Sequence, residues 1–364
     1  MRILSFVFCF FYFYSLYAAD TLSYSVKNVN DWVYYGEEKP KLEVLARNTN
    51  SRGVLYDIEC NIKDFKGNYV YSLGQKGKVA LKDSALLTFV FQAISPGFYE
   101  VDFEEKQGAK KRVNIAYEPE KIVGKSDGKE DFERFILLLQ LNNGRAPVIA
   151  KTVENRRLSG REITIYDVEI NTIDGGKVNG YLAVPEDGKK NGTIITFICE
   201  DEKKSNPLAN FTKEIGMSEL VVFVKKEWKY LYVNEIVAST IKCVNYITSV
   251  KDLNKDKIFV QGSGVAGAYA FVACAASEKL KAGIIENPIF DNFLNQFSID
   301  TFAEKLNAPI LLGFGLQNNV VDLQKIFSVY NNVKVKKEYY GFPTSKNILP
   351  DEWKIIKKNF LEKF

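Results

Sequence analysis

A glycine-rich turn between an apolar run and an alanine-rich run is the feature of this sequence nearest to a catalytic motif. The apolar run covers residues 257–261, the turn begins at Gly262, and a helix is predicted over 268–276. A sharp strand-to-helix turn can expose a nucleophile for attack on an acyl group. Small residues are then needed two positions before and after the nucleophile, because the helix packs close to the strand.

The required spacing of small residues can be aligned with the turn in two frames, which differ in the residue taken as the nucleophile. With Ser263 as the nucleophile, the flanking residues are a glutamine and a valine, which are too large. The other frame uses Gly262 and Ala266 as the small residues and puts Gly264 at the nucleophile position. Glycine tolerates a strained turn but has no side chain that can attack. The sequence therefore predicts a nucleophile turn without a nucleophile.

The chain contains no histidine, which excludes Ser-His-Asp and Cys-His centres and His-ligated metal sites. Cys199 and Ser263 remain as weaker alternative nucleophiles. The carboxylates at positions 200–202 oppose formation of a Cys199 thiolate. We interpret that acidic run as a solvated loop, so no metal and no cofactor is expected. Glu286 and Asn287 are expected only to end a strand.

The first 19 residues have the pattern of a secretory signal peptide. Arg2 precedes an apolar run over residues 3–17, and Ala18 and Ala19 offer a cleavage site. The run is shorter than the roughly 20 residues of a membrane span. We expect export to the periplasm or the extracellular space, with no membrane attachment after cleavage; an uncleaved anchor is the alternative.

Composition places the chain among folded globular proteins. Of 364 residues, 46% are hydrophobic and 26% charged, and the net charge of +4 gives no reason to expect a nucleic-acid partner. Four cysteines remain after residue 19, and their spacings match no known metal site or disulfide framework. We interpret them as buried free thiols, with a disulfide as the alternative. They are Cys60, Cys199, Cys243 and Cys274.

The pattern of strands and helices divides the chain after the signal into three parts. Residues 20–118 show short β-rich runs separated by turns, which predicts an immunoglobulin-like β-sandwich. Its aromatic residues Trp32, Tyr34 and Tyr35 could form a sugar platform, but strand core is favoured. Residues 119–160 are predicted to be a linker and a helix. Residues 161–364 alternate strands and helices, as a doubly wound α/β sheet does.

The region from residue 125 to 364 resembles the acetylxylan esterase / cephalosporin-C deacetylase family of carbohydrate esterases. That family has the α/β-hydrolase fold, and some bacterial relatives similarly carry a β-sandwich before it. Order and spacing together make the resemblance specific. The matching segments are residues 131–135, 166–170, 180–185, 260–267, 315–318 and 338–342.

The resemblance implies that all three members of the family's catalytic triad are replaced. The nucleophilic serine falls on Gly264, the aspartate on Asn318 and the histidine on Phe342. Acidic residues replace the oxyanion segment after the first buried strand, where they would oppose a developing negative charge. Two shortened regions mean that the family's hexamer is not expected here, and the oligomeric state stays open.

These observations predict an exported, catalytically inactive esterase homologue that binds a glycan or a protein partner. One alternative is an active ester hydrolase that uses Ser263 or Cys199. Another is an interaction protein in which the β-sandwich does the binding.

Overall fold

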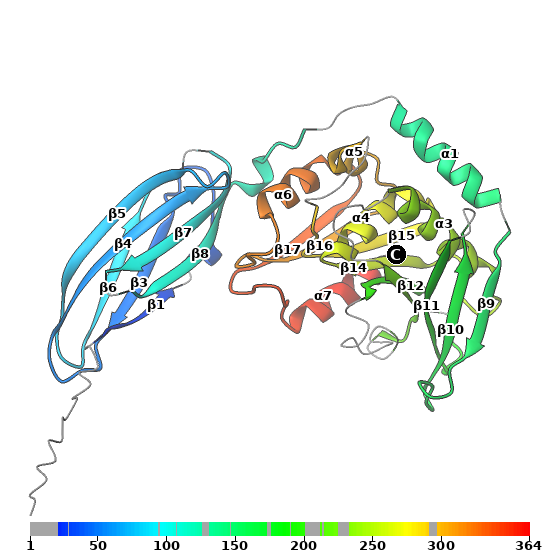
Figure 1. Ribbon diagram of the computed structural model, residues 1–364, viewed down its shortest axis with the longest axis horizontal. Coiled ribbons are helices and arrows are strands. Elements are labelled where there is room, and N and C mark those ends of the chain that lie inside the picture. Colours follow the sequence, from blue (N-terminus) through cyan, green and yellow to red (C-terminus); the bar gives the residue numbers. More distant parts are fainter. Residues whose placement is uncertain are drawn as a thin grey trace, which may run out of the picture.

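The computed structural model describes twelve stretches of the chain, and the predicted signal peptide lies outside them (Figure 1). No helix within these stretches is long and apolar enough to cross a membrane. The described residues are 21–27, 29–93, 95–106, 108–125, 131–145, 147–172, 176–189, 191–200, 212, 215–224, 233–290 and 297–364.

The N-terminal strands form two sheets whose buried faces share one core. A tilted ring pair, Phe89 with Phe103, joins the sheets at a centroid distance of 5.7 Å. The immunoglobulin-like type of this region stays a prediction. The first sheet has the order β1 (Ser23–Lys27), β3 (Lys41–Arg47), β6 (Ser84–Val90). The second has the order β2 (Val33–Tyr34), β8 (Lys110–Tyr117), β7 (Gly97–Glu105), β4 (Val54–Asp64), β5 (Tyr69–Val79).

The three aromatic residues considered as a sugar platform differ in their exposure to solvent. Trp32, in the 3-10 turn η1 (Asn30–Trp32), and Tyr34 are buried, as the core interpretation predicts. Tyr35 is 45% exposed, and its hydroxyl donates to Glu120 Oε1 at 3.3 Å. The core interpretation is therefore confirmed for two residues and wrong for Tyr35.

The connecting segment carries the 3-10 turn η2 (Pro119–Lys121) and helix α1 (Asp131–Arg145). Phe132 anchors α1, because its ring packs edge-on against Phe297 and Phe302. Strand β9 (Ala150–Glu154) lies in the segment predicted as linker and helix, so the sheet begins before residue 161. All five residues of β9 are exposed at the sheet edge, and this strand therefore has no apolar pattern to reveal it.

The second part of the chain is one nine-stranded mixed sheet, the large α/β sheet that the sequence predicts. Strands β12 to β17 pair in parallel, and β9, β10 and β11 pair antiparallel at one side. The order is β17 (Lys337–Phe342), β16 (Ile310–Gly315), β15 (Leu280–Glu286), β14 (Ile258–Ser263), β12 (Thr193–Cys199), β13 (Ser218–Val224), β11 (Lys177–Pro185), β10 (Ile163–Asn171), β9.

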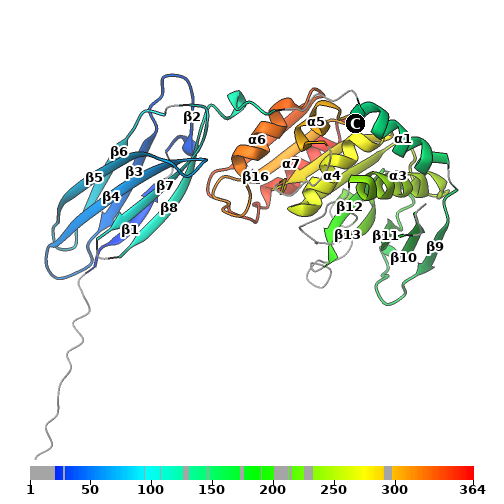
Figure 2. The same cartoon turned by 45° about the horizontal axis from the view of Figure 1, so that its top comes forward.

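Helices cover both faces of this sheet (Figures 1 and 2). Tyr269 of α4 packs on Phe197 of β12, and Trp353 of α7 belongs to the opposite cluster with Phe259 and Leu311. Burial on both faces explains the continuous apolar runs of the parallel strands. The other helices are α3 (Val233–Ser249), α5 (Ile299–Glu304) and α6 (Leu323–Asn332), beside α4 (Val265–Ala276) and α7 (Glu352–Leu361).

Candidate active site

The three positions that the sequence predicts for the triad lie at one edge of the sheet. Gly264 follows β14, Asn318 lies just after β16, and Phe342 ends β17. These strands are parallel, so their carboxyl ends share one edge, where open α/β sheets bind ligands. All three positions therefore lie at the edge of the sheet where a ligand site is expected.

Gly264 occupies the turn between β14 and α4. Its φ of 60° and ψ of −124° lie outside the regions that side-chain-bearing residues ordinarily adopt. The turn is held on both sides: Gly264 N–H donates to Glu286 O at 3.0 Å, and Ile289 N–H donates to Gly264 O at 3.0 Å. A Cβ at position 264 would meet, among the described atoms, Ile289 Cδ1 at 3.9 Å. A Cβ would therefore have room among the described atoms, and the native residue supplies none.

Gly262 is the small residue that the turn requires. A Cβ built on it would lie 2.0 Å from Ala266 O and 2.4 Å from the Ala266 carbonyl carbon. Strand and helix approach so closely that only glycine fits position 262. This geometry supports the frame with Gly264 at the turn, in preference to the frame centred on Ser263.

The two alternative nucleophiles lie in different surroundings. Ser263 is the last residue of β14 and is exposed. Cys199 ends β12 and is buried at 2% exposure, with the exposed Glu200 directly after it. The other acidic residues of that run, at positions 201 and 202, lie outside the described residues.

The described cysteines are all buried thiols, as predicted. Burial raises the pKa of Cys60, Cys243 and Cys274 to about 12 each, so these three are inert at neutral pH. Within the described stretches, no three His, Cys, Asp or Glu side chains are arranged to hold a metal ion.

Asn318 shapes a turn and is 2% exposed. Its Oδ1 accepts the main-chain N–H groups of Val320 at 2.8 Å and Val321 at 3.3 Å. This side chain thus orders the entry into α6 by a local hydrogen-bonding pattern typical of asparagine.

The loop around Asn318 is fastened to the N-terminal part of the chain. Gln317 makes two hydrogen bonds to the backbone of Asn114 in β8: it accepts the N–H at 2.8 Å and donates to the oxygen at 3.1 Å. Asn114 Nδ2 in turn donates to Leu316 O at 3.1 Å. The loop around Asn318 thus joins the two parts of this protein.

Phe342 belongs to the apolar core between the sheet and α7. It is 6% exposed, and its ring packs edge-on against Trp353 of α7 at a centroid distance of 5.9 Å and an angle of 79°. A phenyl ring cannot accept a proton, so position 342 contributes packing and no acid–base chemistry.

Asn287 is an organising residue that the sequence does not reveal, since we expected it only to end a strand. It is buried with a φ of 38°. Its Oδ1 accepts Gly315 N–H at 3.0 Å and its Nδ2 donates to Asn347 O at 3.0 Å. It thereby ties β15 to the end of β16 and to the loop after Phe342. An asparagine after a buried strand is a weak signal, because it equally marks an ordinary turn.

An ion pair lies beside the turn. Glu286 ends β15, and its Oε1 is 2.9 Å from Nζ of Lys357 in α7; the side chains are 20% and 13% exposed. The backbone oxygen of this same Glu286 accepts the Gly264 N–H. The pair therefore connects α7 to the strand that supports the turn.

No family profile matches the chain, but single proteins do. It is 21% identical over 413 aligned positions to the acetyl esterase Axe7A of Xylanibacter ruminicola, covering 95% of this chain and 91% of that protein. That similarity includes the N-terminal strands.

Two solved structures resemble the α/β part. Acetyl xylan esterase 1 from Thermoanaerobacterium sp. JW/SL YS485 has a TM-score of 0.58 and 13% identity, covering 67% of this chain and 97% of the other. The acetyl xylan esterase from Paenibacillus sp. R4 has a TM-score of 0.56 and 14% identity, covering 68% and 98%. The chain is thus similar over nearly its whole length to an acetyl esterase, and its α/β part has the fold of acetyl xylan esterases.

Proposed function

We propose that this protein is an exported, catalytically inactive relative of acetyl esterases that binds a carbohydrate or a protein partner. The observation that carries the proposal is Gly264: the turn that would present a nucleophile is intact, and its residue has no side chain. The other two triad positions support it. Asn318 accepts backbone N–H groups and Phe342 packs on Trp353.

Losing one member of a catalytic triad usually removes several orders of magnitude in rate, and here all three are replaced. The retained fold argues that some function other than catalysis maintains the structure. A binding role, in the periplasm or outside the cell, needs the folded surface but not the triad. The immunoglobulin-like region and the signal peptide are part of this proposal.

The test is hydrolysis of p-nitrophenyl acetate and of acetylated xylo-oligosaccharide by residues 20–364. We expect no rate above the uncatalysed reaction. Hydrolysis that disappears in Ser263→Ala or Cys199→Ala would refute the proposal and identify the nucleophile.

A matched variant carries Gly264→Ser, Asn318→Asp and Phe342→His together. Hydrolysis gained by this variant would attribute the inactivity to the missing side chains alone. Export is tested separately by N-terminal sequencing of the secreted chain, with cleavage expected after Ala18 or Ala19.

A further inference from the structure

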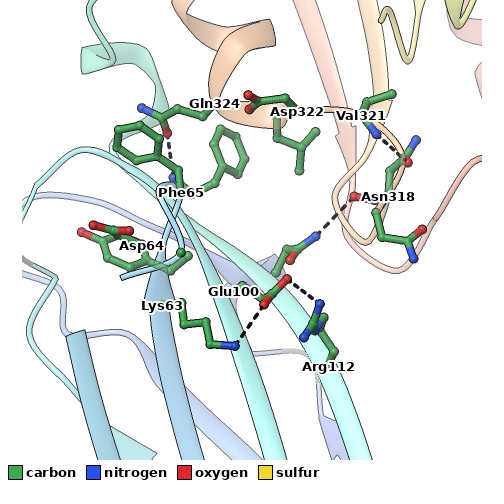
Figure 3. Close-up of a pocket in the computed structure, with 15 residues that line it drawn as sticks. Lys63, Asp64, Phe65, Glu100, Arg112, Asn318, Val321, Asp322 and Gln324 are labelled. Atoms are coloured by element: carbon green, nitrogen blue, oxygen red, sulfur yellow. Dashed lines mark hydrogen bonds and ion pairs between the residues drawn. The ribbon is translucent and has the colours of Figure 1, made fainter. Parts of the chain in front are cut away.

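A cavity of about 400 Å³ lies where the N-terminal strands face the loop that follows β16 (Figure 3). One wall comes from the β4–β5 turn and from β7 and β8, including Phe65, Glu100 and Arg112. The other wall comes from the loop and the start of α6, including Asn319 and Asp322. Its volume is within the roughly 300–1,000 Å³ of small-molecule sites.

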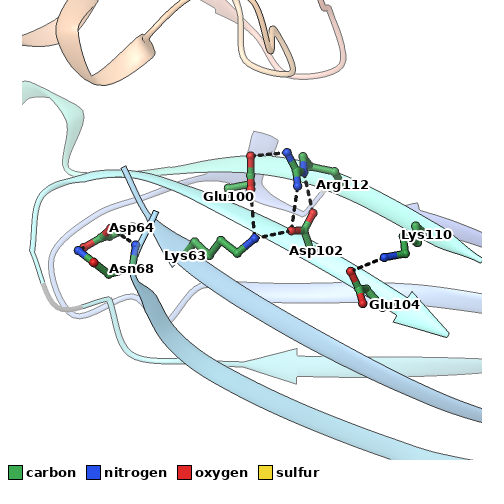
Figure 4. A network of polar contacts seen from close by, with 8 residues as sticks. All are labelled: Lys63, Asp64, Asn68, Glu100, Asp102, Glu104, Lys110 and Arg112. Carbon is green, nitrogen blue, oxygen red and sulfur yellow. Dashed lines mark hydrogen bonds and ion pairs between the residues drawn. The ribbon is translucent and has the colours of Figure 1, made fainter. Parts of the chain in front are cut away.

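The cations of this cavity are already neutralised (Figure 4). Arg112 Nη1 lies 2.7 Å from Glu100 Oε2, and Arg112 Nε lies 2.6 Å from Asp102 Oδ1. Lys63 Nζ lies 3.1 Å from Asp102 Oδ2. Asp64 and Asp322 add further carboxylates to the lining. The walls therefore carry more negative than positive charge, which disfavours an anionic ligand.

The polar groups of the walls are held in place by the protein itself. Asp64 accepts the N–H groups of Lys66 and Asn68, each at 2.9 Å. Gln324 Oε1 accepts Phe98 N–H at 3.1 Å, across the joint between the two parts of the chain. Oxygens of this kind have further lone pairs that can accept from a ligand. Preorganised acceptors reduce the entropy lost when a ligand binds.

Phe65 adds an apolar surface to these acceptors. It is 50% exposed at the β4–β5 turn and lines the cavity. A pyranose ring offers the complementary chemistry: an apolar face of C–H groups and a rim of hydroxyl donors. A neutral saccharide therefore fits the lining better than a phosphate or a uronate.

We propose that this cavity binds a neutral oligosaccharide, with one sugar ring against Phe65 and hydroxyls hydrogen-bonded to Asp64, Asn319 and Gln324. The inference rests on the proposed function and names the place and the ligand class of that binding. Because the walls come from both parts of the chain, the ligand would span their joint.

The experiment is isothermal titration calorimetry of residues 20–364 with xylohexaose, cellohexaose and mannohexaose, and with hexagalacturonate as the anionic probe. We expect saturable binding of at least one neutral hexasaccharide and weaker binding of the anionic one. Phe65→Ala should weaken that binding about tenfold, because it removes the stacking surface. Asn319→Ala, an exposed residue on the opposite wall, should weaken it as well.

Tyr340→Ala is the matched control. Tyr340 is 42% exposed on β17 and is not part of the lining, so its loss should change the affinity less than about twofold. Three results would each overturn the inference: no saturable binding of any neutral probe, equal losses in Phe65→Ala and Tyr340→Ala, or unchanged affinity in Asn319→Ala. Ester hydrolysis is measured on the same protein, so active catalysis would refute the proposed function independently of the binding result.

Discussion

Two glycines of the β14–α4 turn should respond very differently to the addition of a side chain. The paired substitutions are Gly264→Ser and Gly262→Ala. At position 264 the new Cβ would meet Ile289 Cδ1 at 3.9 Å among the described atoms, an ordinary contact. The cost then comes only from the backbone, whose φ of 60° and ψ of −124° disfavour any side chain. We expect a destabilisation of about 1–3 kcal/mol.

At position 262 the cost has a different origin. The Cβ would lie 2.0 Å from the Ala266 carbonyl oxygen, a backbone atom that cannot move without displacing α4. The turn must open to admit the methyl group, so we expect a destabilisation above about 4 kcal/mol, or failure to fold.

The assay is urea unfolding of residues 20–364 followed by circular dichroism, with the parent chain as the reference. If Gly262→Ala is tolerated within about 1 kcal/mol, or if Gly264→Ser is the more costly change, the assignment of Gly264 to the nucleophile position is refuted. A cost of the expected size for Gly264→Ser also means that the turn can carry a side chain, which the triple variant requires.

Three further changes test the surroundings of the site. Phe342→Ala should destabilise the protein by about 3–5 kcal/mol in the same urea assay, because it empties core space beside α7. The control Tyr340→Ala, at a side chain that is 42% exposed, should cost far less. Equal costs of the two substitutions would contradict the packing role of Phe342. Burial alone would raise the pKa of Asp102, but its hydrogen bonds from Arg112 and Lys63 prevail and lower it below the ordinary value. The stabilisation by the ionised Asp102 is therefore present above the unfolded pKa of about 3.9 and is lost as the pH falls through the folded pKa. Asp102→Asn should lower the melting temperature at pH 7, and the difference in melting temperature between variant and parent should disappear at acidic pH. A difference that does not depend on pH would argue against the ion pairs. Gln317→Ala removes two hydrogen bonds to the backbone of Asn114 and should therefore speed hydrogen exchange of the Asn114 N–H. Unchanged exchange would show that the contact between the two parts of the chain does not depend on Gln317.

The parallel strands and the turn could be predicted because their signals are local. The apolar run at 257–261 overlaps β14, and the helix predicted over 268–276 lies within α4. The steric demand of the turn follows from the spacing of Gly262 and Ala266 alone. Strand β9 escaped prediction because an exposed edge strand has no apolar face to reveal it.

Contacts between distant segments decide the roles of Asn318 and Asn287 and the exposure of Tyr35. Nothing local to Asn318 indicates that its loop would be fastened to Asn114, more than 200 positions earlier. Asn287 follows a strand as many asparagines do, and only the packing of β15, β16 and the loop after β17 gives both its amide atoms partners. Tyr35 is similar, since its neighbour Tyr34 is buried while Tyr35 is exposed.

By itself the sequence determines which side chains are available for chemistry. No histidine exists anywhere in the chain, and glycine, asparagine and phenylalanine stand at positions 264, 318 and 342. Side-chain identity sets these limits whatever the fold. The tertiary structure alone decides what these positions do instead: Gly264 keeps the turn, Asn318 orders a loop at the joint, and Phe342 packs on Trp353. It also decides that Phe65 and Asn319, far apart in the chain, face one cavity, because only packing brings such segments together.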